Sequence, residues 1–396
     1  MSNRHSKGST APKDSKEWQT EVLNRALAGS SIHSALLASA PNFDFKQFLM
    51  LRVLWKEHPT GAILRVANLN HWVAQATAKL DQYRSWSTYC DSFRSQEALP
   101  EGTFAIARYY QREVAHTEPK ADPQAFHTPI SSRTRGATNW IGEGVAAIRL
   151  EDPKTPTKKG PKPLPSTSAT SRLENMFGLD DESSPSPSPS PVHLVSPITR
   201  ELGNILYPPT KDEQIVNTAL IVFLNALTIH FPLSSKWTLH RNPFTATFKD
   251  AQFEARTDGY LDSPGGKPRV LIEVKPVLRS LNLLAIQMQE SSQMVAWIKS
   301  DDEFAQKANT TRFHISQDRH YIYVTVATYD HIYLEYLLDG KTSQNQHFLT
   351  MDQYGPWDTT NEGQMRQLGP ILLAITLRAE RESQEEQKRA AKLRSA

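Results

Sequence analysis

The chain has 396 residues, of which 38% are hydrophobic, and a formal net charge of +3 at pH 7. This length accommodates two domains or more, whereas the low hydrophobic share and the excess of 26 prolines over 17 glycines predict a substantial disordered fraction. The single cysteine, Cys90, excludes an intramolecular disulfide and a cysteine-based zinc site, and it favours a reducing compartment.

The apolar segments are too short for a membrane span. None approaches the roughly 18 to 20 apolar residues that a span requires. The longest, over residues 217–231, is interrupted by Asn225 and His230. The first residues also lack the apolar core of a secretory signal. We therefore expect an intracellular protein, in the nucleus or the cytoplasm, with no membrane partner.

We expect residues 1–13 to be disordered and residues 14–116 to form an all-helical region. Apolar residues there recur at spacings of three and four, which is the pattern of helices with one buried face. One stripe consists of Trp18, Val22, Leu23, Ala26 and Leu27. Another consists of Phe45, Phe48, Leu49, Val53 and Leu54, in a helix that would end near Pro59. A third helix is predicted over residues 63–86, and this region could bind a protein partner or position a substrate.

Residues 117–191 are rich in proline, serine and other polar residues. Segments such as the Ser-Pro repeats of residues 183–191 contain too few apolar residues to pack a core, so they predict an extended, disordered linker. The Ser-Pro pairs suit phosphorylation by proline-directed kinases, although a solvated spacer is the favoured interpretation of their main role.

Residues 192–380 carry the densest pattern of a folded domain, and a charged tail follows over residues 381–396. Helices are predicted over residues 210–231, 281–299 and 363–389. Strands are predicted over residues 236–241, 245–248, 252–261, 269–276, 320–330 and 332–338. This order of elements predicts an α/β fold, with a mixed sheet flanked by helices.

Charged residues interrupt two of these strands, where a buried side chain would normally be apolar. Strand periodicity places Asp258 on one face of the strand 252–261, and it places Glu273 and Lys275 on one face of the strand 269–276. The connecting sequence, DSPGGK, has the residues of a hairpin turn. If the two strands pair, two carboxylates and a lysine converge at one spot.

Such a group has a clear chemical use. Hard oxygen ligands bind Mg²⁺ or Mn²⁺, which contacts phosphate and lowers the pKa of a bound water. A nearby lysine can orient that water or stabilise developing negative charge. We therefore expect Asp258 and Glu273 to hold Mg²⁺ or Mn²⁺ beside Lys275.

The motif TDGYL…LIEVK resembles the core of the PD-(D/E)XK nuclease superfamily, which has a restriction-endonuclease-like fold. The resemblance covers about 180 residues and includes the order of helix, three strands, helix and strand. It implies that Asp258 and Glu273 are the two metal-binding acids and that Lys275 is the catalytic lysine. Thr257, rather than proline, precedes Asp258. The chain is also similar to fungal proteins that join a proline-rich linker to this fold.

Three further residues receive roles from the same resemblance. Gln293 in ESSQMVAWI matches the glutamine of the Gln-x-x-x-Tyr element of RecB-like members, with Trp297 in place of the tyrosine. Glu213 lies where some members carry an additional metal-binding glutamate on the first helix. Val274 is expected to offer its backbone carbonyl to the metal.

Each assignment has an alternative. Glu273 and Lys275 could be an edge-strand pair that blocks aggregation, and Asp258 could be a solvated acid near a turn. Glu213 fits a capping box with Thr210 better than a metal ligand, Gln293 could be an exposed helix residue, and Trp297 fits a core position. His314 and His320 flank an expected loop and would lie on the surface.

The leading hypothesis is a Mg²⁺-dependent nuclease that acts on DNA, with RNA as the less favoured substrate. Charged residues near the proposed site could contact phosphates: Glu254, Arg256, Lys267, Arg269 and Arg279. One alternative is a catalytically inactive interaction protein that keeps the nuclease fold as a scaffold. Another is a toxin, effector or selfish-element protein that uses such a nuclease on a foreign or host genome.

Overall fold

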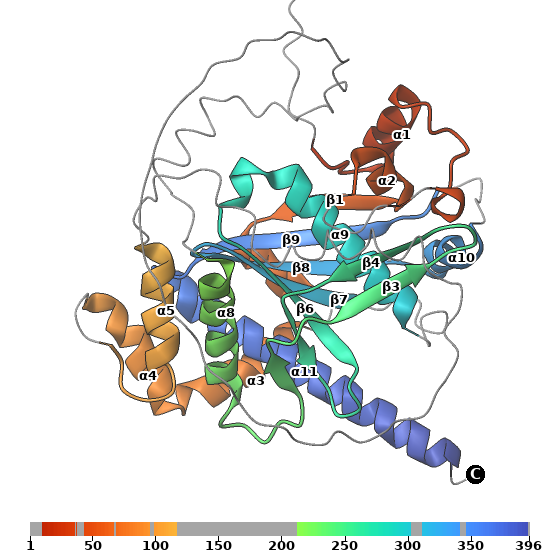
Figure 1. The fold of residues 1–396 in the computed structure, drawn as a ribbon. Coiled ribbons are helices and arrows are strands. Elements are labelled where there is room, and N and C mark those ends of the chain that lie inside the picture. The colour runs from red at the N-terminus through yellow and green to blue at the C-terminus, as the bar shows by residue number, and fades with distance from the viewer. Residues whose placement is uncertain are drawn as a thin grey trace, which may run out of the picture. The chain divides into compact units, whose positions relative to one another are not determined.

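The computed structural model describes residues 10–35, 37, 43–66, 69–95, 99–116, 212–301, 311–340 and 346–394 (Figure 1). The predicted linker over residues 117–191 lies outside these ranges. The expectation of disorder at residues 1–13 is wrong for its last four residues, because Ala11 is buried and the carbonyl oxygen of Pro12 accepts a 2.9 Å hydrogen bond from the amide of Trp55.

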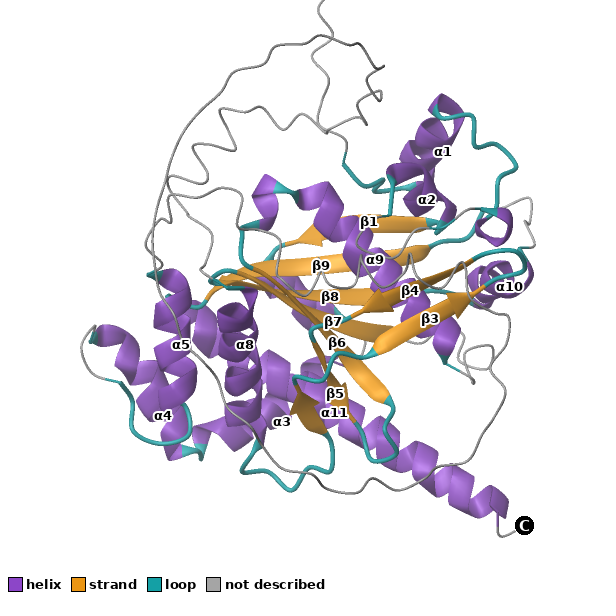
Figure 2. Ribbon diagram, viewed as in Figure 1, coloured by secondary structure: helices purple, strands orange, loops and turns teal. Residues whose placement is uncertain are grey.

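The described residues form a seven-stranded mixed sheet with the strand order β1-β9-β8-β7-β6-β5-β2 (Figure 2). Its strands are β1 (Val53–His58), β2 (Lys236–Thr238), β5 (Gly259–Asp262), β6 (Pro268–Lys275), β7 (Thr311–Asp318), β8 (Tyr321–Thr328) and β9 (Leu349–Asp358). The pairs β1–β9 and β6–β7 are parallel, and the other pairs are antiparallel. The expected α/β class with a mixed sheet is therefore confirmed.

Helices and a hairpin cover the two faces of this sheet. One face buries apolar side chains of β6, β7 and β8 against α3 (Leu69–Asp81), α4 (Arg84–Asp91), α5 (Ala105–Ala115), α8 (Glu213–Thr228) and α11 (Glu362–Arg394). The other face packs against α1 (Ser15–Asn24), α2 (Phe45–Met50), α9 (Leu283–Ser300), α10 (His331–Asp339) and the separate hairpin of β3 (Pro243–Thr247) and β4 (Gln252–Arg256). Two apolar layers thus sandwich the sheet.

The expectation of an all-helical N-terminal region is wrong. The second apolar stripe continues past α2 into β1, because Arg52 adopts a left-handed conformation (φ 55°) that ends the helix. Strand β1 then pairs with β9, and the indole of Trp55 donates a 2.8 Å hydrogen bond to the hydroxyl of Ser291 on α9. The N-terminal elements and the C-terminal α/β elements consequently belong to one compact unit.

Two further predictions of local structure differ from the fold. Residues 332–338, predicted as a strand, form helix α10, which begins at the capping side chain of Asp330 and ends at Gly340 with a φ of 69°. Strands β7 and β9 were not expected, although β8, α8, α9 and the closing helix were. Strand β7 is paired with β6 and with the adjacent β8, and β9 is paired with β8 and with the distant β1. Both strands therefore depend on tertiary pairing as well as on local propensity.

Helix α11 continues to Arg394, so described residues of the predicted charged tail are helical. Pairs at a spacing of four, such as Arg381 with Glu385 at 2.7 Å, follow this helix. Glu386 forms a 2.5 Å ion pair with Arg269, which ties α11 to the start of β6. None of the described helices combines the length and the hydropathy that a membrane span requires.

Candidate metal centre

A break in the predicted strand 252–261 positions Asp258. Residues 252–256 form β4 of the hairpin, whereas β5 begins at Gly259 in the main sheet. Between them, the amide of Asp258 donates to the carbonyl of Ile272 at 3.0 Å, and the Asp258 carbonyl accepts from Asn217 of α8 at 3.0 Å. A Cβ atom at Gly259 would lie 2.5 Å from the Thr238 carbonyl oxygen. Glycine therefore lets β5 approach β2 and brings Asp258 up to β6.

Glu273 and Lys275 lie on one face of β6, as strand periodicity predicts. The Nζ atom of Lys275 donates a short hydrogen bond to Oε1 of Glu273, and it lies 3.8 Å from Oε1 of Glu213. Asp258 reaches the same strand, because its Oδ2 accepts from the amide of Val274 at 3.1 Å. The structure thus brings together the two predicted acids and the predicted lysine.

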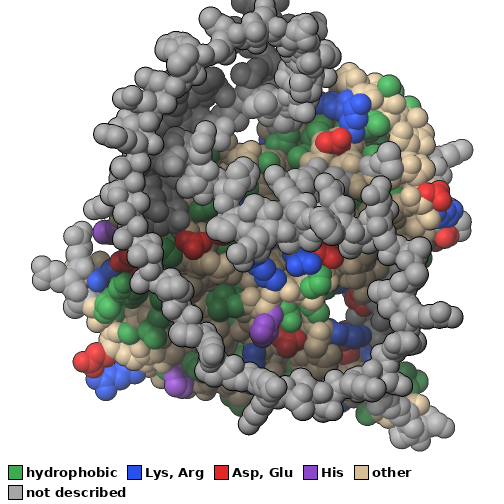
Figure 3. Space-filling model, viewed as in Figure 1, with side chains coloured by type: hydrophobic (Ala, Val, Ile, Leu, Met, Phe, Trp, Pro, Cys, Tyr) green, Lys and Arg blue, Asp and Glu red, His purple; other side chains and the backbone are tan. Residues whose placement is uncertain are grey.

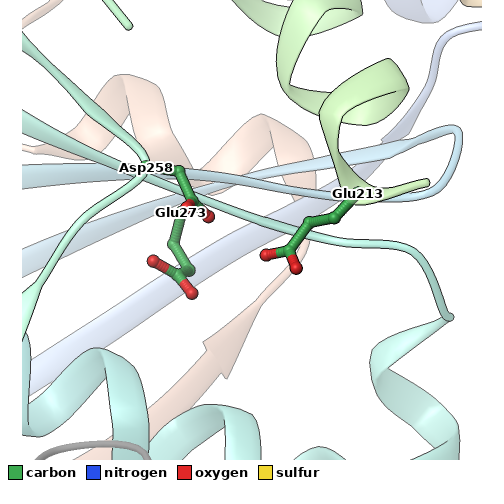
Figure 4. A group of neighbouring side chains, drawn as sticks. All are labelled: Glu213, Asp258 and Glu273. Atoms are coloured by element: carbon green, nitrogen blue, oxygen red, sulfur yellow. The ribbon is translucent and has the colours of Figure 1, made fainter. Parts of the chain in front are cut away.

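Glu213 completes the group from the first turn of α8. Asp212 is the N-cap residue, and its side chain accepts from the amide of Gln214 at 3.0 Å. The favoured capping box of Thr210 and Glu213 is therefore wrong, since Glu213 opens the helix; Thr210 itself lies outside the described residues. Glu213 points away from the helix axis toward Asp258 and Glu273 (Figure 4).

The three carboxylates could hold a metal ion. Within the described ranges, Glu213, Asp258 and Glu273 each offer an oxygen, and these oxygens lie within 4.8 Å of one another. Carboxylate oxygens are the ligands that Mg²⁺ and Mn²⁺ prefer, so the residues present fit such an ion. Val274 contacts Asp258 through its amide, and the expected metal contact of its carbonyl stays a prediction.

Electrostatics at this group favour a cation. Burial, followed by repulsion from Asp258, raises the pKa of Glu273 to about 8, although Lys275 opposes the shift. Burial likewise raises the pKa of Glu213. Burial acts against the charged form of Lys275, but the three carboxylates together raise its pKa, so the lysine stays protonated. Three carboxylates held this close together repel one another, and an added positive charge relieves that repulsion.

Gln293 contacts the acidic group and is buried, whereas the alternative expectation was an exposed helix residue. Its side-chain amide donates to Oε2 of Glu273 at 2.6 Å and to the carbonyl of Arg256 at 2.8 Å, and the residue is fully buried. Four residues further along α9, Trp297 is a core residue that packs against Phe244 and Arg312. Gln293 therefore joins α9, the hairpin and the acidic group.

The expectation that His314 and His320 lie on the surface is wrong, since both are buried. His314 lies on β7, and its Nε2 is 3.3 Å from Oε1 of Gln293. Because the Gln293 amide nitrogen already donates twice, its oxygen must accept, so the proton of a neutral His314 is on Nε2. His314 thereby supports Gln293 from the sheet side.

The structure also revises the expected phosphate contacts. Arg279 is buried in ion pairs with Asp318 and Glu290, so it does not reach a substrate. Arg241, which sequence reasoning missed, lies 3.2 Å from Oδ1 of Asp258. Gln289 was also missed and donates to Glu273. Its position one turn before Gln293 on the same helix was the available signal, whereas Arg241 lies in a loop with no motif.

Comparison with known proteins gives no assignment: neither a protein-family model nor a curated protein matches this chain. The geometry of the described residues is therefore the basis for any function.

Proposed function

We propose that this chain is a divalent-metal-dependent nuclease of the PD-(D/E)XK type that hydrolyses phosphodiester bonds, with DNA as the first substrate and RNA as the second. The observation that carries the proposal is the convergence of Glu213, Asp258 and Glu273 with Lys275 in contact with Glu273. Acidic clusters also occur without metal, but here a lysine and a glutamine are directed at the same carboxylate.

The order of elements supports the same proposal. Along the chain, α8, β2, β5, β6, α9 and β7 resemble the order of helix, three strands, helix and strand of this superfamily, with the β3–β4 hairpin placed between the first two strands. Strands β2, β5, β6 and β7 are also neighbours in the sheet, in that sequence. A restriction-endonuclease-like fold is therefore part of the proposal.

The residues divide the chemistry among them. A bound Mg²⁺ or Mn²⁺ would neutralise charge on the scissile phosphate and acidify a water. Glu213 of α8, Asp258 of the connection between β4 and β5, and Glu273 of β6 would hold it from three segments, which fixes its place relative to the sheet. Lys275 keeps its proton beside Glu273 and would stabilise negative charge that develops during attack. Gln289 and Gln293 orient the Glu273 carboxylate.

The chain carries little net charge, +3 at pH 7. On the face that it draws, Figure 3 shows acidic and basic side chains intermixed where the described residues are visible. Such a surface gives weak long-range attraction to nucleic acid. We therefore expect binding to depend on contacts at the metal centre itself, with modest affinity and little sequence preference.

A second candidate is a catalytically inactive scaffold. One observation favours it: both oxygens of Glu273 already accept side-chain hydrogen bonds, and Arg241 pairs with Asp258. A cluster satisfied by its own side chains has less need of a metal. In this case the chain would bind no Mn²⁺, and its N-terminal elements would serve protein contacts.

Cleavage and metal binding together decide between the two. We expect the purified full chain to cut single- or double-stranded DNA in Mg²⁺ or Mn²⁺, and Glu273→Gln to abolish cutting. Lys275→Met should slow it by about 100- to 1000-fold, the loss typical of a removed charge-stabilising donor. Glu385→Gln, which removes an exposed acid on α11, is the control that should cut normally.

Undiminished cutting by both Glu273→Gln and Lys275→Met would refute the nuclease assignment. Calorimetry provides the second readout. An absence of Mn²⁺ binding by the wild-type chain would favour the scaffold, whereas binding that is lost in Glu273→Gln would support the metal centre even before a substrate is known.

A further inference from the structure

Among the ion pairs of the acidic group in the described part of the chain, the pair of Arg241 and Asp258 has the most exposed partner. Arg241 lies in the connection between β2 and β3, and 43% of its side chain is accessible to solvent. Its Nη2 is 3.2 Å from Oδ1 of Asp258. The other carboxylate oxygen of Asp258 is bound to the amide of Val274, and the residue is buried. The carboxylate is therefore fixed, while the guanidinium can swing into solvent.

Lys275 is the contrasting cation of the same group. Only 18% of its side chain is accessible, and it contacts both Glu273 and Glu213. Withdrawing it would leave the buried carboxylate of Glu273 without its cation, which is costly. Lys275 is thus a permanent charge of the site, whereas the pair of Arg241 and Asp258 resembles a surface ion pair that exchanges at little cost.

A cation at Asp258 would compete with the Arg241 guanidinium for the same carboxylate. Two like charges held next to one carboxylate repel each other, so metal binding favours the arrangement in which Arg241 has moved away. A phosphate group at the metal would then meet a free guanidinium beside it. Arginine binds phosphate through two parallel hydrogen bonds, which makes it well suited to receive that group.

We propose that Arg241 is an exchangeable substrate-binding residue: it neutralises Asp258 in the metal-free protein and transfers to a phosphate of the nucleic-acid backbone when metal and substrate bind. This inference rests on the proposed nuclease function. It predicts opposite effects of removing Arg241, since the metal loses a competitor and the substrate loses a partner.

The test measures two affinities on the full chain. Calorimetry with Mn²⁺ alone should give a dissociation constant about two- to fivefold lower for Arg241→Gln than for wild type, as expected for the loss of a competing surface ion pair. Binding of a labelled single-stranded oligonucleotide in Ca²⁺ should be weakened by about tenfold in the same variant, the effect of one lost charged hydrogen bond. Arg241→Lys keeps the charge but not the planar fork. Its affinities for Mn²⁺ and for the oligonucleotide should both lie between those of wild type and Arg241→Gln.

The matched control is Arg366→Gln. Arg366 is also 43% exposed and is paired with Glu362 at 2.9 Å, but it lies on α11 and outside the acidic group. It should change neither affinity. Unchanged or weaker Mn²⁺ binding by Arg241→Gln would overturn the proposal, as would oligonucleotide binding equal to that of wild type.

Failure of the nuclease function gives a different result. If the wild-type chain binds Mn²⁺ but no oligonucleotide, the proposed function and the transfer to phosphate both fall, and tighter Mn²⁺ binding by Arg241→Gln would establish only the competition at Asp258. If wild type binds the oligonucleotide and Arg241→Gln binds it equally well, the proposed function stands and the role of Arg241 is refuted.

Discussion

Two charged clusters lie side by side on the same face of the sheet, and they use their charges differently. The acid cluster comprises Glu213, Asp258, Glu273 and Lys275, and the arginine cluster comprises Arg279, Glu290, Ser316, Asp318 and Gln353. Register places Glu273 beside Ser316 and Lys275 beside Asp318 across the pair β6–β7. The acid cluster has three carboxylates around one lysine. The arginine cluster has two carboxylates around a guanidinium.

Access and bonding separate the two clusters. In the arginine cluster, Arg279 donates to Asp318 at 2.5 Å, to Glu290 at 3.0 Å, to Ser316 at 2.8 Å and to Gln353, and it lies over the ring of Tyr323. All five members are buried. In the acid cluster, Glu213 and Lys275 still reach solvent. The arginine cluster is thus suited to fixing the short 3-10 helix Arg279–Leu281 to β7, β9 and α9, and of these two clusters the acid cluster is the one suited to receiving a solute.

Removing Arg279 should have the largest effect on stability. Arg279→Met leaves Glu290 and Asp318 buried without their cation, and breaking such a buried pair costs about 3–5 kcal/mol of unfolding free energy. Burial acts against its charge, but its carboxylate partners raise its pKa, so the guanidinium is charged throughout the accessible pH range. Urea denaturation monitored by circular dichroism provides the measurement.

The matching variant in the acid cluster is Lys275→Met. Lys275→Met should cost clearly less than Arg279→Met, because Glu213 can turn toward solvent and Glu273 can take up a proton. Equal losses would show that both clusters are structural, and they would remove the distinction drawn between them. Arg279→Lys should be intermediate, since an ammonium group cannot reproduce the forked contacts of the guanidinium.

The sequence identifies the acid cluster better than the arginine cluster. Asp258, Glu273 and Lys275 were predicted because their charges stand out inside apolar segments, whereas Gln293 was predicted from the family resemblance alone. Arg279 was predicted to contact phosphate, and nothing local distinguishes it from an exposed arginine. Its burial follows from Asp318 on β7 and Gln353 on β9, two strands that the sequence pattern did not reveal.

The helices and strands of the fold were also predictable only where the local sequence pattern is strong. Long helices with strong periodicity, such as α8 and α9, were predictable, whereas β1 was assigned to a helix because its apolar residues continue the spacing of α2. Its hydrogen-bonding partner, β9, lies almost three hundred residues away. Helix α10 is an instructive error, since the Asp330 cap and Gly340 marked its ends while its aromatic content favoured a strand.

His314, which contacts Gln293 next to the acid cluster, should make stability depend on pH. Burial, followed by the charges of Arg279 and Lys275 and opposed by Asp258, lowers its pKa from 6.5 to about 3. Between these values the unfolded chain binds a proton that the folded chain does not, so stability falls as pH falls. The stabilisation that the lowered pKa of His314 gives to the folded state is complete above pH 6.5. About 2 kcal/mol of the unfolding free energy is lost by about pH 5.

The comparison with His314→Gln isolates this effect. Glutamine can donate to Gln293 from nearly the same place and does not titrate in this range. As pH is lowered from about 7 to about 5, wild type should therefore lose more unfolding free energy than His314→Gln does. A difference that stays constant with pH would contradict a buried neutral His314. His331→Gln, at an exposed position, serves as the control.

The smallest expected effect concerns the helix end that presents Glu213. Asp212 caps α8, and its replacement by alanine should cost about 1 kcal/mol. Because Glu213 is the first residue of α8, fraying of this turn moves a ligand of the acid cluster and leaves the arginine cluster unaffected. Asp212→Ala should therefore bind Mn²⁺ more weakly than Asp212→Asn, which has lost the same charge but keeps the cap. Equal Mn²⁺ affinities in the two variants would mean that Glu213 is not a ligand, and the metal centre would then consist of Asp258 and Glu273 alone.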